Sequence, residues 1–303
     1  MKVVALAGGT GSAKLLRGLS RLPIELTVLA NVGDNIWTYG AYVCPDVDIA
    51  TYTLAGISSG RGWGIVGDSF QALRELSHLG EDTWFRLGDR DLAVCLARTE
   101  MMRKGGSLTE VTERIASALG ARAAILPVTN DRVETRILTR NGNLHLQEFW
   151  VRDRGRPKAT GVRYVGARAA KPTPEVEAAL SAADRVVVCP ANPVTSVGPM
   201  LAVNGFRRLL READGRKVAL SPMEGAGPFS GPAGKLLRAT GTSADSYGVA
   251  RLYSDFLDCI VISDADSILI ERIRALGMEC AVTDTRIRGP TDELRLAKAM
   301  IRA

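Results

Sequence analysis

Near its start the chain reads Val3-Val4-Ala5-Leu6-Ala7-Gly8-Gly9-Thr10-Gly11-Ser12-Ala13-Lys14-Leu15-Leu16. A short apolar run comes first, glycines follow it, and leucines then recur at helical spacing. This order predicts a strand, a tight turn and a helix. Residues 26–30, Leu-Thr-Val-Leu-Ala, predict a second strand. A strand, a helix and another strand in this order are typical of a parallel sheet.

Helix and strand patterns alternate again after Pro174, a residue suited to the first turn of a helix. Strands are expected at 186–189, 218–221, 260–262 and 280–282, with helical patterns between them. We therefore predict an α/β fold, a Rossmann-like and mostly parallel sheet with helices on both faces.

The stretch at about 45–165 has a different character. It contains helical patterns and a capping box, Ser107-Leu108-Thr109-Glu110. Strands are expected at 123–126, 133–138 and 144–149, and we predict that they are antiparallel because Asn141-Gly142 is a hairpin signal. We expect a single domain over residues 1–303, with this helix-rich and antiparallel subdomain inserted into it.

Composition narrows the class of protein. The 303 residues, 46% hydrophobic and 24% charged, suit a globular protein with one large core. No apolar run approaches the roughly 20 residues that span a bilayer, so we expect no membrane segment and a cytoplasmic location. The net charge of +6 is scattered among carboxylates and aromatic residues make up only 5%, which favours small anionic ligands over nucleic acid. Five cysteines without a C-x-x-C spacing predict reduced, mostly buried thiols.

The loop after the first expected strand is a candidate phosphate site, because ligands of open parallel sheets bind at the carboxyl ends of strands. Its glycines let backbone amides approach an anion at the start of a helix. The loop is no Walker A motif, since Leu15 replaces the Ser or Thr that would hold magnesium. A tight turn that binds nothing is the alternative. The candidate residues are Gly9, Thr10, Gly11 and Lys14.

Two further loops follow expected strands. Residues 190–199 are rich in helix breakers and present Asn192, Thr195 and Ser196 before a helix. Residues 221–235 form a second glycine-rich loop. Two such loops at one sheet edge predict a diphosphate site, and helix capping is the alternative role. The candidates in the second loop are Ser230, Gly231, Gly234 and Lys235.

Acidic residues gather in the irregular stretch after the second strand. Asp46 and Asp48 offer the oxygen ligands that Mg²⁺ prefers. The alternative is that Asp48 caps a helix beginning near Ile49 and that Asp46 is a solvated loop residue. Neither of the two histidines lies in a pattern for a catalytic triad or a zinc site.

Five motifs, in order and spacing, resemble the 2-phospho-L-lactate transferase family over nearly the whole chain. Each motif alone is weakly specific, but together they are specific. They are Ala7-Gly8-Gly9-Thr10-Gly11-x-x-Lys14-Leu15-Leu16, Pro45-Asp46-Val47-Asp48, Leu87-Gly88-Asp89-Arg90-Asp91, Asn192-Pro193-x-Thr195-Ser196-x-Gly198-Pro199 and Ser230-Gly231-Pro232-Ala233-Gly234-Lys235-Leu236.

The resemblance implies a reaction and its site. A phosphorylated three-carbon acid, 2-phospholactyl or phosphoenolpyruvyl, would pass from a guanylyl diphosphate donor to the terminal hydroxyl of the deazaflavin 7,8-didemethyl-8-hydroxy-5-deazariboflavin. GMP would be released, as a step of coenzyme F420 biosynthesis. The resemblance also implies Mg²⁺ and commonly a homodimer.

The family's site residues carry over onto matching positions. Asp48 and Arg90 would bind the deazaflavin, while the glycine loops and Asn192 would bind the guanylyl donor. Beyond the family's residues, the chemistry of phosphoryl transfer requires that oxygen charge be neutralised, and we expect Lys14, Lys235 and backbone amides to hold the diphosphate. Asp46 or Asp48 would bind Mg²⁺ or accept the hydroxyl proton, and sequence does not separate these two roles.

Two other classes compete with a transferase. One is a non-enzymatic, nucleotide-sugar-binding metabolic regulator of related fold, against which the motifs at 45–48 and 87–91 argue. The other is an NAD oxidoreductase. Against it, the chain lacks the third glycine of the dinucleotide-binding motif and has Asn31 where an acidic residue would bind the ribose. The identity of the three-carbon acid stays open, since a few atoms distinguish the possible donors.

Overall fold

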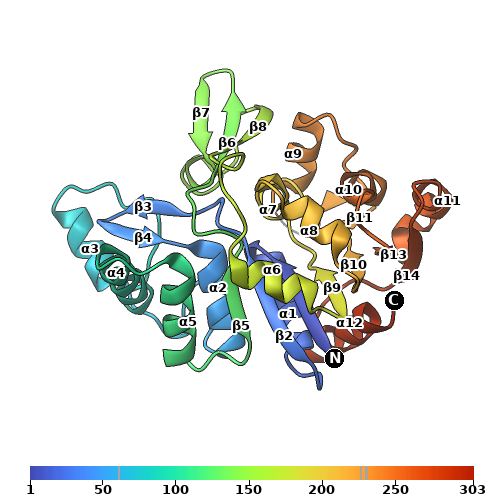
Figure 1. Cartoon of the computed structure of the whole chain (residues 1–303). Coiled ribbons are helices and arrows are strands. Elements are labelled where there is room, and N and C mark those ends of the chain that lie inside the picture. The colour runs from blue at the N-terminus through green and yellow to red at the C-terminus, as the bar shows by residue number, and fades with distance from the viewer. Residues whose placement is uncertain (61, 226, 229–230) are drawn as a thin grey trace.

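A computed structural model describes residues 1–60, 62–225, 227–228 and 231–303 of the chain (Figure 1). Its centre is a seven-stranded sheet in the order β14-β13-β10-β9-β1-β2-β5, in which every neighbouring pair is parallel. The strands are β1 Lys2–Ala7, β2 Glu25–Ala30, β5 Ala124–Pro127, β9 Arg185–Val188, β10 Arg216–Leu220, β13 Cys259–Ser263 and β14 Glu279–Thr283.

Strand β1 lies between β2 and β9, and its position determines where a ligand can bind. Residues 3–7 are apolar without alternation and are all buried, as expected of a strand covered on both faces. Val3 pairs with Leu26 of β2 on one side and with Arg185 of β9 on the other. The chain reverses its direction of strand addition here, which opens a crevice at the carboxyl ends of β1 and β9.

Helices cover both faces of this sheet. Crossovers between parallel strands are right-handed, so the helices after β1 and after β9, which lead in opposite directions, lie on opposite faces. One face carries α1 Gly9–Leu19, α2 Pro45–Leu54 and α12 Pro290–Arg302. The other carries α6 Pro174–Ser181, α7 Val197–Ala202, α8 Phe206–Glu212, α10 Ser246–Tyr253 and α11 Ile270–Arg274. The predicted α/β fold class is confirmed.

The remaining elements lie around this core (Figure 1). They are the hairpin β3 Ile36–Thr38 and β4 Ala41–Val43, the helices α3 Gln71–His78, α4 Asp89–Arg103 and α5 Leu108–Ala118, the antiparallel sheet β7-β6-β8 with β6 Glu134–Thr139, β7 Gly142–His145 and β8 Ala159–Val165, the pair β11 Met223–Glu224 and β12 Gly227–Pro228, α9 Ala233–Ala239 and the 3₁₀ helix η2 Asp264–Leu269. The capping box at Ser107 and the Asn141-Gly142 hairpin are confirmed.

Three local predictions differ from the structure. The strand expected at 123–126 is β5, which pairs parallel to β2 as the edge of the main sheet, because its apolar residues continue that core. The strand expected at 144–149 ends at His145, and a π-helical turn, Glu148–Arg152, follows it so that Phe149 packs fully inside. Strand β8 completes the antiparallel sheet and had no sequence prediction. The inserted subdomain at about 45–165 stays a prediction.

The five cysteines are free and buried. No described helix is both long and apolar enough to cross a membrane.

Candidate functional site

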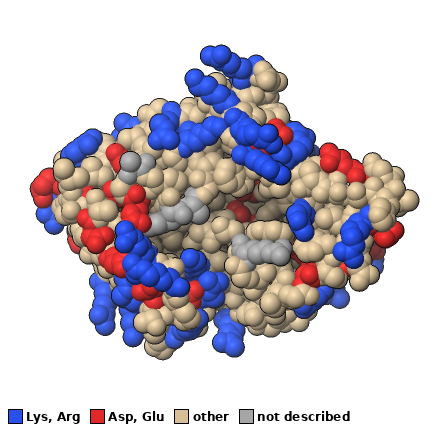
Figure 2. Space-filling view, turned by 180° about the vertical axis from the view of Figure 1, so that it is seen from behind, with Lys and Arg blue, Asp and Glu red and all other residues tan. Residues whose placement is uncertain are grey.

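A cavity of about 1150 Å³ lies at the carboxyl ends of β1, β2 and β9. The loops after these strands form one side of it. Much of the remaining lining comes from residues 58–60, 62–64, 84–87, 231–233 and 285–288 and from the turn around residues 146–154. Figure 2 shows the back of the molecule, hollowed near its middle, with basic side chains around the hollow and acidic atoms inside it.

Most of the predicted site residues that the structure describes line this cavity. They are Gly9, Thr10, Gly11, Lys14, Asp46, Asp48, Asn192, Thr195, Ser196 and Gly231. Segments far apart in the sequence are therefore brought to one place, as the position of their loops after parallel strands predicted.

Helix α1 begins at the cavity and its first turn is closely packed. Gly9 donates its backbone N–H to the Asp46 carboxylate at 2.7 Å. The next amides, of Thr10 and Gly11, lie in the first turn, where backbone N–H groups have no carbonyl partner inside the helix. A Cβ on Gly11 would stand 2.4 Å from the carbonyl oxygen of Pro190, so only glycine fits there. Amides at this helix start are suited to bind an anion.

The loop after β9 is shaped by its own asparagine. Asn192 accepts hydrogen bonds from the backbone N–H groups of Val194 (2.9 Å) and Thr195 (3.3 Å) through its side-chain oxygen. A Cβ on Gly8 would lie 2.6 Å from Cβ of Ser196. The β1 and β9 loops thus touch without room for a side chain, and they form one continuous wall of the cavity.

Asn31 links two carboxylates, those of Asp34 and Asp46, beside this wall. Its side-chain nitrogen donates to Asp46 at 2.8 Å and to Asp34 at 3.1 Å. Both acids line the cavity and are less than a tenth exposed. Burial raises the pKa of Asp46 to about 6, against the effects of the Asn31 and Gly9 hydrogen bonds. Burial and then the charge of Asp46 raise the pKa of Asp34 well above its usual range.

Asp48 is paired with a buried arginine. Helix α2 begins at Pro45 and not near Ile49, so Asp48 lies inside the first turn and the alternative capping role is wrong. Its carboxylate accepts two hydrogen bonds from Arg98 of α4. The Arg98 side chain is only 1% exposed. Burial raises the pKa of Asp48 while Arg98 opposes that rise. Burial alone would lower the pKa of Arg98, but Asp48 and neighbouring sulfurs outweigh it and hold that pKa well above its usual value.

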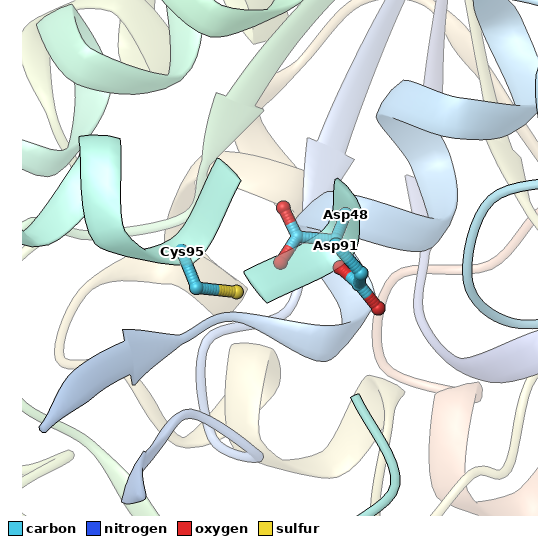
Figure 3. Close-up of side chains that lie close together, drawn as sticks. All are labelled: Asp48, Asp91 and Cys95. Carbon is cyan, nitrogen blue, oxygen red and sulfur yellow. The ribbon is translucent and has the colours of Figure 1, made fainter. Parts of the chain in front are cut away.

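Asp91 and Cys95, from the first turns of α4, lie beside Asp48 (Figure 3). One ligand atom from each of these three residues falls within 4.8 Å of the others, so the group forms a candidate metal site. The hydroxyl of Tyr52 donates to Asp91 at 2.7 Å. Burial, followed by the charge of Asp48, raises the pKa of Asp91 to about 7.

Three predicted site residues lie away from the cavity or have other partners. Arg90 is exposed, and its guanidinium donates to the carbonyl of Val66 at 3.1 Å. Gly234 is buried in α9 and does not line the cavity. Lys235 donates to the backbone carbonyls of Gly155 and Pro157. The prediction at Ser230 lies outside the described residues.

Sequence reasoning missed an aromatic part of the cavity. Trp63, Trp84 and Trp150 line it from three separate segments. The Arg152 guanidinium stacks on Trp84 with 5.8 Å to the ring centroid, which joins two of these segments. The high aromatic content of residues 31–67 was a signal for the first tryptophan, but nothing local marked the other two.

Comparison with known proteins identifies the family. The model of the family described as 2-phospho-L-lactate transferase CofD matches residues 3–295. The chain belongs to this family. It is therefore an enzyme, a transferase of coenzyme F420 biosynthesis.

Individual relatives align with this CofD family member over almost its full length. It is similar to a 2-phospho-L-lactate transferase of Methanopyrus kandleri, 40% identical over 100% of this chain and 97% of the relative. It is similar to a phosphoenolpyruvate transferase of Streptomyces griseus, also 40% identical, over 92% of this chain and 91% of the relative. Among solved structures, a UPF0052 family member from Bacillus halodurans matches with a TM-score of 0.66 and 18% identity over 99% of this chain and 98% of that one, which shows the fold alone.

Proposed function

We propose that this enzyme transfers a phosphorylated three-carbon acid from a guanylyl diphosphate donor to the terminal hydroxyl of the deazaflavin precursor of coenzyme F420. The hydroxyl oxygen forms a bond to the phosphorus that bears the acid. The bond from that phosphorus to the bridging oxygen of the diphosphate breaks, GMP leaves with the electron pair, and the hydroxyl loses its proton. One observation carries the proposal: a single cavity joins the first-turn amides of α1 to the paired carboxylates of Asp34 and Asp46.

The two substrates have separate places in this proposal. The diphosphate lies against the amides of Thr10 and Gly11, supported by Lys14 and by the Asn192 loop, because helix starts favour anions. The flat deazaflavin ring stacks in the aromatic part of the cavity, near Trp63, Trp84 and Trp150. A volume of about 1150 Å³ exceeds the usual pocket for one small molecule and leaves room for both ligands.

Asp34 and Asp46 fit Mg²⁺ better than the Asp48 group does. Two hard carboxylates that share one asparagine and repel each other would gain from a divalent cation between them. Asp48 already has Arg98 as its counter-charge, and the thiol of Cys95 is a poor ligand for Mg²⁺. When bound, the ion neutralises charge on the phosphates during transfer.

The acids near α4 suit the acceptor side. Asp48, paired with Arg98, orients the ribityl chain, and Arg90 holds the loop before α3 through the carbonyl of Val66. Tyr52 donates to one carboxylate oxygen of Asp91, and the Asp91 pKa of about 7 is close to that of an efficient proton acceptor at neutral pH. We therefore assign Asp91 the proton of the attacking hydroxyl.

The choice of acid and the assembly state are the finer parts of the proposal. Relatives named for phospholactate and for phosphoenolpyruvate are both 40% identical to this chain, so overall identity favours neither donor. The family resemblance supports a homodimer, which light scattering on the purified protein tests.

The reaction is tested by product mass. The protein is incubated with deazaflavin, Mg²⁺ and each guanylyl donor in turn, and products are weighed by mass spectrometry. We expect one adduct of the deazaflavin with a phosphorylated three-carbon acid, together with GMP. No adduct with any donor would contradict the proposal.

A further inference from the structure

The basic residues that line the cavity differ in whether their side chains have a partner within the protein. The structure describes six of them: Lys14, Arg17, Arg86, Arg154, Arg286 and Arg288. Five have partners, namely the carbonyl of Ile287 for Lys14, Glu293 for Arg17, the Phe70 ring for Arg86, Glu224 for Arg286 and Asp284 for Arg288. Within this described set, only the Arg154 side chain has no hydrogen bond, ion pair or ring contact. Among these described residues, the exposed Arg154 thus has a positive charge that is available for a ligand.

Arg154 is also held in an unusual backbone conformation. Its φ is 54°, in the left-handed region that residues with a side chain rarely adopt. Gly155 follows with a φ of 62°. Such conformations persist only where the surroundings fix them, and they concentrate at ligand sites.

The surroundings of Arg154 come from two distant parts of the chain. The turn closes on itself, because Gly155 donates its N–H to the carbonyl of Phe149 at 2.7 Å. Lys235 of α9 donates to the carbonyls of Gly155 and, at 2.8 Å, of Pro157, and its ammonium lies 5.4 Å from the centre of the Phe149 ring. These bonds fix the backbone directly after Arg154.

We propose that Arg154 binds the carboxylate of the three-carbon acid on the guanylyl donor, and that Lys235 is the positioning residue that holds it there. The inference rests on the proposed function and names the part of the donor that this arginine recognises. The diphosphate is already served by amides at the start of α1, which leaves the carboxylate as the remaining fixed negative group of the donor. A guanidinium binds a carboxylate through two parallel hydrogen bonds, which a free arginine in the cavity can supply.

The first test compares binding of the donor with binding of GDP, which lacks the acid. Calorimetry without deazaflavin needs no turnover, so it stays informative even if the transfer assay fails. We expect Arg154→Gln to weaken donor binding by about ten- to hundredfold, the value of a charged hydrogen-bonded contact, and to leave the Kd of GDP unchanged. Arg154→Lys keeps the charge but not the fork, so an intermediate loss is expected. Arg156→Gln is the matched control, since Arg156 is exposed and does not line the cavity.

The outcomes separate the possible ligands of Arg154. Equal losses for donor and GDP would assign Arg154 to the diphosphate and overturn the proposal. Unchanged donor binding, or a wild-type protein that binds donor no more tightly than GDP, would overturn it as well.

The second test concerns Lys235. We expect Lys235→Met to weaken donor binding without changing GDP binding, and to add little to Arg154→Gln in the double variant, because both changes remove the same contact. Weaker GDP binding in Lys235→Met would mean that Lys235 contacts the diphosphate, and it would refute the positioning role. Additive losses in the double variant would refute it too.

Discussion

Replacing Asp48 with asparagine is expected to destabilise this protein strongly. The change keeps the size of the side chain but removes the carboxylate from a pair in which the Arg98 side chain is 1% exposed. Among the described residues, the guanidinium would keep the carbonyl of Tyr42 and the sulfur of Cys95 as acceptors, at 3.2 and 3.7 Å, together with the single oxygen of the new amide, and none of these carries the negative charge that was lost. Removing one member of a buried ion pair costs about 3–5 kcal/mol, because the other charge stays buried without compensation.

For a protein of this size, 1 kcal/mol corresponds to roughly 2 °C in the melting temperature, so Asp48→Asn should melt about 6–10 °C lower. Thermal and urea unfolding of the purified variant measure the effect. A helix-capping role would give a nearly silent change, since asparagine caps about as well as aspartate.

A second pair of variants separates charge from packing. Arg98→Met alone leaves Asp48 without its counter-charge and should also destabilise the protein. The double variant, Asp48→Asn with Arg98→Met, contains no buried charge at this place and should recover much of the stability lost by either single change. A melting temperature of Asp48→Asn equal to that of the wild type would refute the reasoning. In the stable double variant, a loss of turnover on the order of a hundredfold would reveal the role of the Asp48 charge in the reaction itself.

Three further outcomes are expected. Gly11→Ala should weaken GDP binding at least tenfold in equilibrium titrations, because the added Cβ would meet the carbonyl oxygen of Pro190 at 2.4 Å; unchanged affinity in a folded variant would count against the α1 site. Chelation of Mg²⁺ should abolish product formation while deazaflavin binding, followed by fluorescence, changes little; full activity in chelator would exclude the metal from the reaction. The pKa of Asp91 is raised to about 7 in the folded state, so the wild type loses stability as pH rises from about 4 through 7. The free energy of unfolding of Asp91→Asn, measured by urea titration, should therefore rise relative to that of the wild type by on the order of 2–4 kcal/mol between pH 5 and 8. A difference between the two proteins that does not change with pH would contradict this pKa.

Local signals were enough to predict the core and the glycine loops. The β1 strand, its turn and the α1 helix follow from neighbouring residues, and the rule that ligands bind at the carboxyl ends of parallel strands brings the β1 and β9 loops together. The loop positions from Gly9 to Lys14 and from Asn192 to Ser196 therefore could be predicted without a structure.

Long-range pairs could not be predicted in this way. Arg98 lies 50 residues from Asp48 and Lys235 lies 80 residues from Gly155, and no periodic pattern links such positions. Each pair forms because separate helices, α2 with α4 and α9 with the turn after β7, meet in three dimensions. The edge strand β5 was assigned to the wrong sheet for a related reason. Its four residues fit a parallel or an antiparallel neighbour equally well, and only packing selects β2.

The central place of β1 also matters while the chain is being synthesised. Val3 pairs with Arg185, so one edge of the strand stays uncovered until about 180 further residues have been made. At about 5–20 residues per second this takes roughly 10 to 35 s, whereas β2, on the other side, is ready within a few seconds. An apolar strand with an open edge invites pairing with another chain during that interval. This protein is accordingly most prone to aggregation during synthesis, while only the N-terminal half of the nascent chain has been made.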